Sequence, residues 1–254
     1  MNNLDQYYTK DDIAIHCINK VKTFIDISKY TIIEPSAGTG AFFKYLPQAI
    51  GLDLEPKYQG IIKQDFLEYI PNSNNNIIIG NPPFGKNSSL ALKFFNKSAD
   101  FADYICFILP RTFRKPTIVN KLNKYFHLQY EEILPKNSFI YLDKSYDVPC
   151  VFQIWAKKEY NREYIDTNII CKHIEFTTFD NCDYMIRRVG GLAGKVIPKD
   201  PKYSISSNYC IKSSNKIKEL LNNSYDELNT IASDVAGNPS LSKYELRYYI
   251  NKQF

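Results

Sequence analysis

The sequence predicts an α/β protein with a doubly wound, mainly parallel sheet, followed by a smaller α+β region. Two observations predict this class. Strand-type and helix-type segments alternate at short intervals up to about residue 110, as in βαβ units. From about residue 160 the pattern changes to short β-type runs punctuated by glycine and proline. We therefore expect a first domain over residues 1–159 and an α+β appendage over residues 160–254, a candidate substrate-recognition region.

The elements of the first domain follow from the spacing of apolar residues. Helical spacing predicts helices over residues 11–27, 88–101 and 118–126. Thr9 precedes the first of these, with two aspartates in the first turn, and we expect it to cap the helix. Short apolar runs bounded by turn residues predict buried strands, which we expect over residues 30–34, 49–56, 61–67, 77–80, 103–110, 130–134 and 148–156.

The appendage carries weaker patterns. Short β-type runs occupy residues 183–189, 195–197 and 209–212, and helical spacing covers residues 214–228 and 243–251. The segment shows no internal repeat and no helix-turn-helix or zinc signature.

Composition favours an intracellular globular protein. Hydrophobic residues make up 44% of the 254 residues and charged residues 23%, which is ordinary for such a protein. No apolar run of about 18 residues occurs, and residues 1–6 are polar, which supports neither a membrane span nor a signal peptide. The six cysteines are scattered without a CxxC, and the three histidines have no metal-ligand spacing. We expect reduced thiols, no metal, a monomer, and a cytoplasmic location (host cytoplasm or nucleus if the protein is viral).

The net charge of +5 is unevenly distributed. Residues 1–110 sum to −1 and the remainder to +6, and every arginine lies from Arg111 onward. A near-neutral first part followed by a basic remainder fits a small-molecule site joined to a surface that faces a polyanion. The alternative is a lysine-rich solvated face in a compositionally biased chain. The candidate phosphate contacts are Arg111, Arg114, Lys115, Arg187 and Arg188.

A stiff loop follows the strand expected over residues 77–80. It reads Asn81-Pro82-Pro83-Phe84. Consecutive prolines fix φ near −65° and donate no hydrogen bonds, so the loop carbonyls stay free to accept them. One carboxamide, free carbonyls and one aromatic ring suit a planar group that donates hydrogen bonds, such as an amino-substituted heterocycle. An ordinary strand-to-turn junction is the alternative.

A glycine loop follows the strand expected over residues 30–34. After Glu34 the sequence reads Pro35-Ser36-Ala37-Gly38-Thr39-Gly40. Two glycines one residue apart allow a tight turn and close approach of a ligand, and nucleotide-type cofactors bind at such junctions. The loop is neither a P-loop nor a full GxGxxG. A purely structural glycine turn is the alternative.

Acidic residues follow the next two expected strands. Asp53, with Glu55 as second candidate, ends the strand over residues 49–56, where a carboxylate commonly accepts hydrogen bonds from ribose hydroxyls. Asp65 is followed by Phe66, and an acid beside an aromatic ring suits an adenine base. Each acid alone is most often a turn or cap residue.

The order of these motifs resembles the S-adenosylmethionine-dependent amino-methyltransferases. It is most similar to the gamma-ordered adenine-N6 group, in which the cofactor motifs precede the catalytic Asn-Pro-Pro-Phe (NPPF) motif. The resemblance covers roughly residues 5–156 and implies a Rossmann-like class I methyltransferase fold. It implies an S-adenosyl-L-methionine site formed by Thr9, Glu34, Pro35, Ser36, Ala37, Gly38, Gly40, Asp53, Asp65 and Phe66.

The resemblance also implies the catalytic roles. Asn81 and the carbonyl of Pro82, in the corner completed by Pro83, would accept hydrogen bonds from the target amine, and Phe84 would stack on the target base. Phe139 or Tyr141 is the candidate for the opposite face of this clamp. The implied activity is site-specific DNA methylation at adenine N6. Open alternatives are RNA adenine, cytosine N4, protein glutamine, or a non-catalytic module that binds nucleic acid or a partner.

The residue chemistry agrees with this activity. The lone pair of an exocyclic adenine amine is delocalised into the ring, so the amine is a poor nucleophile. Two acceptors aimed at its hydrogens would localise the lone pair. Because a sulfonium methyl is already activated, positioning and acceptor electrostatics suffice without a metal or a strong base.

Overall fold

The computed structural model describes residues 7–235 and 237–254. The chain divides into two compact units, Met1–Tyr164 and Ile165–Phe254. The boundary expected from the sequence is at residue 160. Each unit is described by itself below.

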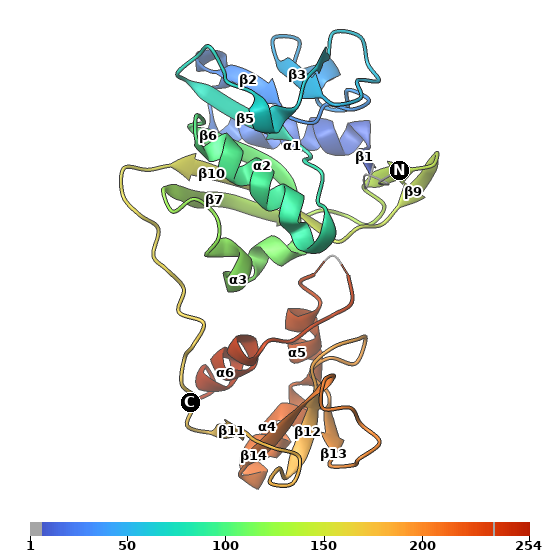
Figure 1. Ribbon diagram of the computed structural model, residues 1–254, viewed down its shortest axis with the longest axis vertical. Helices are drawn as coiled ribbons and strands as arrows, with labels where there is room; N and C mark the ends of the chain where they lie inside the picture. Colours follow the sequence, from blue (N-terminus) through green and yellow to red (C-terminus); the bar gives the residue numbers. More distant parts are fainter. Residues whose placement is uncertain (1–6, 236) are drawn as a thin grey trace. The chain divides into compact units, whose positions relative to one another are not determined.

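The first unit is built on a seven-stranded sheet with the order β4-β3-β2-β5-β6-β10-β7 (Figure 1). The strands are β2 (Thr31–Glu34), β3 (Ile50–Asp53), β4 (Ile62–Lys63), β5 (Asn76–Gly80), β6 (Tyr104–Pro110), β7 (Phe126–Ile133) and β10 (Cys150–Lys157). From β4 to β6 the neighbours pair in parallel, whereas β10 runs antiparallel to both β6 and β7. The predicted mainly parallel sheet is confirmed.

Helices cover both faces of this sheet. In Figure 1, α1 (Asp11–Phe24) lies behind the sheet and α2 (Ser89–Ala99) in front of it. Each presents apolar residues on one side, and these are buried. All five residues of β5 are buried, because helices cover the sheet on both sides. The remaining helical elements of the unit are α3 (Pro116–Val119), η1 (Ile27–Lys29), η2 (Phe43–Tyr45), η3 (Phe66–Glu68), η4 (Lys86–Ser88) and η5 (Arg111–Arg114).

The helix predicted over residues 118–126 is wrong in its extent. The helix α3 covers only Pro116–Val119, and Phe126 already begins β7. Beyond α3, the side-chain oxygen of Asn123 accepts from the backbone N–H of Tyr125 at 3.0 Å and forms a turn just before β7. The spacing of apolar residues carries no signal of this turn.

The sequence did not predict a second, three-stranded sheet of order β1-β8-β9. It joins β1 (Tyr8–Thr9) to the hairpin of β8 (Phe139–Tyr141) and β9 (Lys144–Tyr146), with Thr9 opposite Phe139. The predicted Thr9 helix cap is wrong. Thr9 lies in β1, and the residue at the cap position of α1 is Lys10, which makes no side-chain cap bond.

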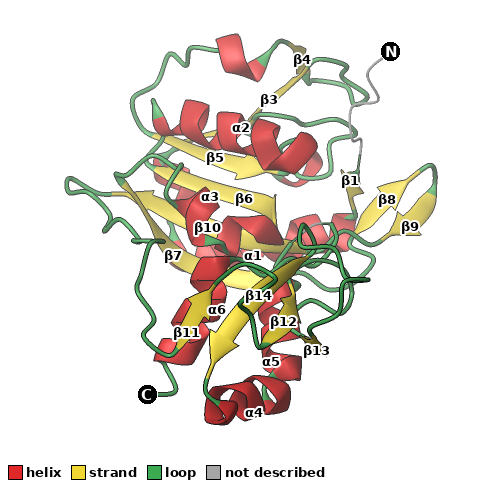
Figure 2. Cartoon of the chain, turned by 60° about the horizontal axis from the view of Figure 1, so that its bottom comes forward, coloured by secondary structure: helices red, strands yellow, loops and turns green. Residues whose placement is uncertain are grey.

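The second unit is an α+β structure, as expected (Figure 2). Its antiparallel sheet has the order β11-β14-β12-β13. The elements are β11 (Ile174–Phe176), β12 (Tyr184–Arg187), β13 (Val196–Pro198), β14 (Asn208–Ser213), α4 (Asn215–Asn223), α5 (Tyr225–Ala232) and α6 (Lys243–Asn251). The helix predicted over residues 214–228 is two helices, because the chain bends at Ser224.

Across both described ranges, no helix combines the length and apolar character needed to cross a membrane.

Candidate active site

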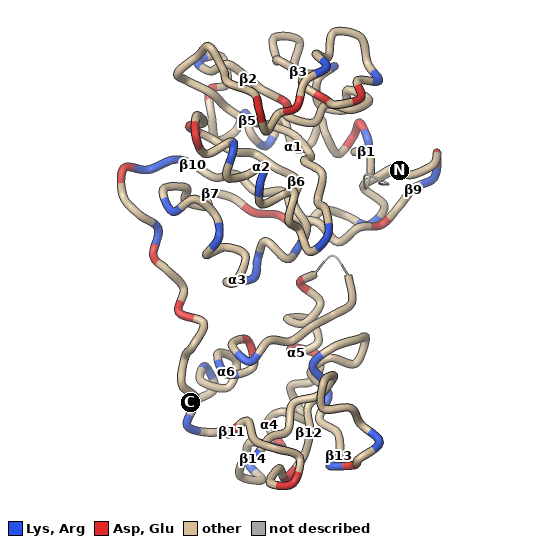
Figure 3. The backbone as a smooth tube through the Cα atoms, viewed as in Figure 1, with Lys and Arg blue, Asp and Glu red and all other residues tan. Residues whose placement is uncertain are grey.

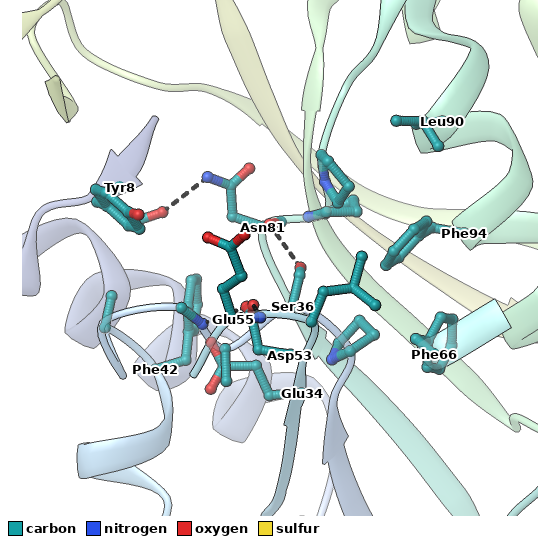
Figure 4. Close-up of a pocket in the computed structure, with 18 of the residues that line it drawn as sticks. Tyr8, Glu34, Ser36, Phe42, Asp53, Glu55, Phe66, Asn81, Leu90 and Phe94 are labelled. Atoms are coloured by element: carbon teal, nitrogen blue, oxygen red, sulfur yellow. Dashed lines mark hydrogen bonds between the residues drawn. The ribbon is translucent and has the colours of Figure 1, made fainter. Parts of the chain in front are cut away.

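The carboxyl ends of β2, β3 and β5 open onto a cavity of about 260 Å³ (Figure 4). Ligands of open α/β sheets bind at this edge, outside the carboxyl ends of the strands. The glycine loop, the acids after β3 and β4, and the diproline corner all contribute to the lining. The predicted site residues that line it are Thr9, Glu34, Pro35, Ser36, Ala37, Gly38, Asp53, Asp65, Phe66, Asn81, Pro82, Pro83 and Phe84.

A direct hydrogen bond joins the glycine loop to the diproline corner. The Ser36 hydroxyl donates to the backbone carbonyl of Asn81 at 2.9 Å, as drawn in Figure 4. Parallel pairing of β2 with β5 brings the two loops together, because both strands end at the same edge. The two motifs therefore line one cavity.

The carboxamide of Asn81 is held in one orientation. Its Nδ2 donates to the backbone carbonyl of Tyr7 at 3.2 Å and to the Thr9 hydroxyl oxygen at 3.1 Å. Its Oδ1 is buried and has no partner among the residues that the structure describes. A buried acceptor without a donor costs about 1–3 kcal/mol. The site thus presents an acceptor that a ligand N–H can satisfy.

The second acceptor of the corner is the carbonyl of Pro82. Within the described chain no donor reaches this carbonyl oxygen, and Pro82 itself is buried. Proline removes the two N–H groups that would otherwise compete here. The corner therefore offers two acceptor oxygens and few donors.

Glu34, at the end of β2, is 2% exposed. Burial raises the pKa of its carboxyl well above the ordinary value, although the backbone N–H groups of Phe42 and Phe43 partly oppose this by hydrogen bonding to it. Oε2 of Glu34 has no partner within the described ranges. A cationic ligand group in this cavity would favour its charged form.

Two carboxylates shape the cofactor side of the cavity. Asp53 accepts from the backbone N–H of Gly38 at 2.7 Å and of Glu55 at 2.8 Å. It therefore ties the glycine loop to the end of β3. Asp65 accepts from the backbone N–H of Leu67 at 2.8 Å and caps η3. Both carboxylates are half-buried and line the cavity.

The glycines of the loop adopt backbone conformations that other residues rarely adopt. Gly38 has φ of +48° and Gly40 has φ of +79°. A Cβ on Gly40 would lie 2.8 Å from Cγ of Tyr58. Gly40 is not among the cavity-lining residues; its position supports the turn, and its N–H donates to the carbonyl of Ala37.

The aromatic candidates occupy different environments. Phe66 is buried and stacks on Phe94 with ring centroids 5.2 Å apart, and Phe84 is 8% exposed at the cavity wall. Phe139 is fully buried in the core. Tyr141 is 36% exposed. Of the two clamp candidates, only Tyr141 thus offers a ring to solvent.

The basic candidates fall in both units. Arg111 and Arg114 lie in η5, directly after β6, and Lys115 follows them. Arg114 pairs with Glu131 at 2.9 Å. Arg187 ends β12 in the second unit, and the adjacent Arg188 places its guanidinium 5.4 Å from the ring centroid of Tyr209.

Sequence reasoning missed several cavity residues. Tyr7 and Tyr8 enter from the N-terminal segment, Leu54 follows Asp53, and Leu90 and Phe94 come from α2. Leu54 had a usable signal, because it stands between two acids at a strand end, and it is 50% exposed at the cavity. For Phe94, helical spacing could indicate only a buried face. No cluster of three or more metal-ligating residues occurs in the described parts of the chain.

No protein-family model matches the sequence, and no curated protein matches it. Solved structures similar to this chain include a candidate RNA methyltransferase from Pyrococcus horikoshii. It is 18% identical, has a TM-score of 0.48, and the match covers 61% of this chain and 87% of that one. The modification subunit of a candidate type I restriction enzyme from Vibrio vulnificus is 14% identical with a TM-score of 0.47, covering 60% and 44%.

A third similar structure is the 23S rRNA methyltransferase ErmE, which is 11% identical with a TM-score of 0.45, covering 63% of this chain and 72% of that one. The fold itself is clear from the strand order, the antiparallel β10 and the cavity at the carboxyl edge. It is a Rossmann-like class I methyltransferase fold, as the sequence motifs implied.

Proposed function

We propose that the protein is an S-adenosylmethionine-dependent methyltransferase that methylates the exocyclic N6 amine of adenine in DNA. The observation that carries this proposal is the carboxamide of Asn81. Its Nδ2 is held by two acceptors, and its buried Oδ1 has no partner in the described ranges. An acceptor fixed in this way at a diproline corner suits an amine that must be held by its hydrogens.

The residues of the cavity fit S-adenosylmethionine. The unpartnered oxygen of Glu34 suits the cationic amine of the methionine part. Asp53, at the end of β3, suits ribose hydroxyls, and Asp65 beside Phe66 suits adenine. Bound here, the cofactor supplies an activated sulfonium methyl group.

Each residue of the corner then has a separate task. Asn81 Oδ1 and the Pro82 carbonyl accept hydrogen bonds from the two hydrogens of the amine, which localises its lone pair. Phe84 borders the cavity and excludes water beside the base. Well-held geometry of this kind supplies on the order of 7–11 kcal/mol of barrier lowering. Electrostatic stabilisation by preorganised groups adds to it.

A base in a duplex must leave the stack to reach this corner. Unstacking and unpairing cost a few kcal/mol, and stacking against aromatic side chains offsets part of that cost. The exposed ring of Tyr141 can supply stacking. Arg111, Arg114 and Lys115 follow β6, the strand next to β5, and we assign them the contacts with the backbone phosphates.

The test is mass spectrometry of nucleosides from DNA and RNA incubated with the protein and isotopically labelled cofactor. We expect labelled N6-methyldeoxyadenosine from DNA. If labelled N6-methyladenosine formed in RNA alone, the assigned substrate would be RNA and not DNA. If labelled N4-methyldeoxycytidine formed, the assigned target base would be cytosine and not adenine. Absence of label in both polymers would contradict the proposal.

The Asn81→Ala variant tests the mechanism. Methyl transfer should fall by at least a hundredfold, since removing a preorganised group that stabilises the transition state costs about this much. Cofactor affinity, measured by calorimetry, should stay within twofold of wild type. Asn161→Ala, at an exposed asparagine of the first unit, is the matched control. Retained turnover in Asn81→Ala would refute the assigned role.

A further inference from the structure

The sheet of the second unit has two unlike faces. On one face Tyr184, Ile186, Tyr209 and Ile211 belong to an apolar cluster that includes buried residues of α4, α5 and α6. The other face carries a small apolar cluster around Met185 and Cys210. Because side chains alternate along a strand, Arg187 and Asn208 share this second face with Met185 and Cys210.

Arg187 and Asn208 stand directly opposite each other in the pairing of β12 with β14. Side chains of directly opposed residues lie on the same face and in reach of each other. They line a cavity of about 280 Å³, close to the lower end of the usual size of ligand pockets, roughly 300 Å³. The segment after β13 closes it with Lys202, Tyr203 and Ser204.

Asn208 lines this cavity and carries an unused acceptor. The residue is 3% exposed, and its Nδ2 donates to the backbone carbonyl of Ser204 at 2.7 Å. This bond fixes the amide, so Oδ1 is the free end. Oδ1 is buried and without a partner among residues 7–235 and 237–254. Leaving a buried acceptor without a donor costs free energy, and a ligand N–H that donates to Oδ1 would remove this cost.

The rest of the lining is cationic and aromatic. Arg187 and Lys202 contribute positive charge, and Lys202 is partly neutralised by Asp200 at 2.8 Å. Tyr203 contributes an aromatic ring. Figure 3 shows Lys and Arg beside β12 and β13. An N–H acceptor, a ring and cations in one cavity match the three parts of a nucleotide: the N–H groups of its base, the flat face of that base, and the phosphate.

We propose that this cavity binds one nucleotide of the nucleic-acid strand, as a recognition site separate from the methyl-transfer cavity. The inference rests on the proposed function for its choice of a polymer over a free mononucleotide. Oδ1 of Asn208 accepts from an N–H of the base, Tyr203 stacks on the base, and Arg187 with Lys202 contacts the phosphate. The second unit would thereby contribute sequence preference.

The test measures binding of a fluorescein-labelled single-stranded oligonucleotide to the full chain by anisotropy, without cofactor. The variants are Arg187→Gln, Lys202→Gln and Asn208→Leu. Lys212→Gln is the matched control, because Lys212 is an exposed cation on the same strand as Asn208 and does not line the cavity. Free mononucleotides are tested in parallel by saturation-transfer NMR.

We expect Arg187→Gln and Asn208→Leu to weaken strand binding at least fivefold, and Lys212→Gln less than twofold. Arg187→Gln should also lower the slope of log affinity against log salt by about one. Equal losses in all variants, control included, would overturn the proposal. So would mononucleotide binding with unaltered strand binding, which would assign the cavity to a free nucleotide.

Two features keep the test decisive. If Asn208→Leu lowers the melting temperature sharply, Arg187→Gln and Lys202→Gln decide, since both positions are at least partly exposed. Because the readout needs neither cofactor nor methyl transfer, failure of the proposed methyltransferase activity leaves this result interpretable. Conversely, strand binding that is unaltered in Arg187→Gln and Asn208→Leu would refute this site without contradicting the proposed methyl transfer by the first unit.

Discussion

The hydroxyl oxygen of Thr9 lies 3.1 Å from Nδ2 of Asn81, although the two residues are 72 positions apart in the sequence. Thr9 is held there by pairing with Phe139 of the β8–β9 hairpin. A ring stack between Tyr7 and Tyr146, with centroids 5.0 Å apart, fastens the same segment to that hairpin. The hairpin thus positions the N-terminal segment, and that segment orients the carboxamide.

The Thr9→Val variant tests this orientation. Valine keeps the shape of threonine but cannot accept a hydrogen bond, so the carboxamide keeps only its bond to Tyr7. One lost hydrogen bond is worth about 1–2 kcal/mol, which corresponds to a rate loss of roughly five- to thirtyfold. Single-turnover methyl transfer measures this loss, and calorimetry should show unchanged cofactor affinity.

Thr23→Val is the control for this variant, because the Thr23 hydroxyl donates to the carbonyl of Lys20 within α1. It should leave the rate unchanged. If Thr9→Val instead weakened cofactor binding with no change in rate, Thr9 would contact the cofactor directly, as the sequence resemblance first implied.

Local sequence patterns predicted much of this site. The parts that depend on contacts between distant segments could not be predicted from the sequence. Gly38, Asp53, Asp65 and Asn81 lie at or shortly after the carboxyl ends of strands, so the parallel sheet alone brings them to one edge. The pairing of β1 with β8 has no local signature. It depends on contacts between distant segments, and each of its strands is too short to show alternation.

The Gly40→Ala variant tests the glycine loop. At φ of +79°, alanine costs roughly 1–2 kcal/mol of backbone strain. Its Cβ would also come within 2.8 Å of Tyr58, which is 43% exposed and can move. We expect a stability loss of that size in urea unfolding, together with weaker cofactor binding. Gly191→Ala is the control, since a Cβ there meets nothing within 4 Å; equal losses in both variants would argue against a strained loop.

Glu34 should make the stability of the free protein depend on pH. Burial raises the pKa of this carboxyl well above 4.5, the ordinary value that it regains on unfolding. Between these two pKa values the folded state holds more protons than the unfolded state, so stability falls as pH rises. The stabilising contribution is complete below pH 4.5 and is lost as pH rises through the folded pKa.

The Glu34→Gln variant removes this titration. Above pH 5, the free energy of unfolding of wild type should fall with pH by at most about 1.4 kcal/mol per pH unit because of Glu34. The variant should lack this part of the pH dependence. Urea unfolding at half-unit steps from pH 5 to pH 8.5 measures the difference. Glu55→Gln, at an exposed carboxylate of the same cavity, serves as the control. Parallel pH profiles for wild type and Glu34→Gln would contradict the assignment.

Arg162 explains why the first unit extends beyond the predicted boundary. The sequence around it is polar and looks like a linker, yet its guanidinium donates to the backbone carbonyls of Val119, Leu122, Asn123 and Phe126. It also lies 5.4 Å from the ring centroid of Trp155. A polar pattern cannot distinguish a solvated arginine from one that satisfies the carbonyls between α3 and β7.

The Arg162→Lys variant should therefore destabilise the first unit although the charge is kept. An ammonium group cannot reproduce a planar fork that reaches several carbonyls, and hydrogen bonds to charged groups contribute about 1.5–3 kcal/mol each. We expect a loss of roughly 3 kcal/mol in urea unfolding, and faster proteolysis between β10 and the second unit. Arg247→Lys is the control for replacing an arginine by a lysine. The guanidinium of Arg247 lies 5.1 Å from the ring centroid of Phe176. If both variants lost equally little, the carbonyl contacts would contribute nothing specific, and the segment after β10 would behave as a linker.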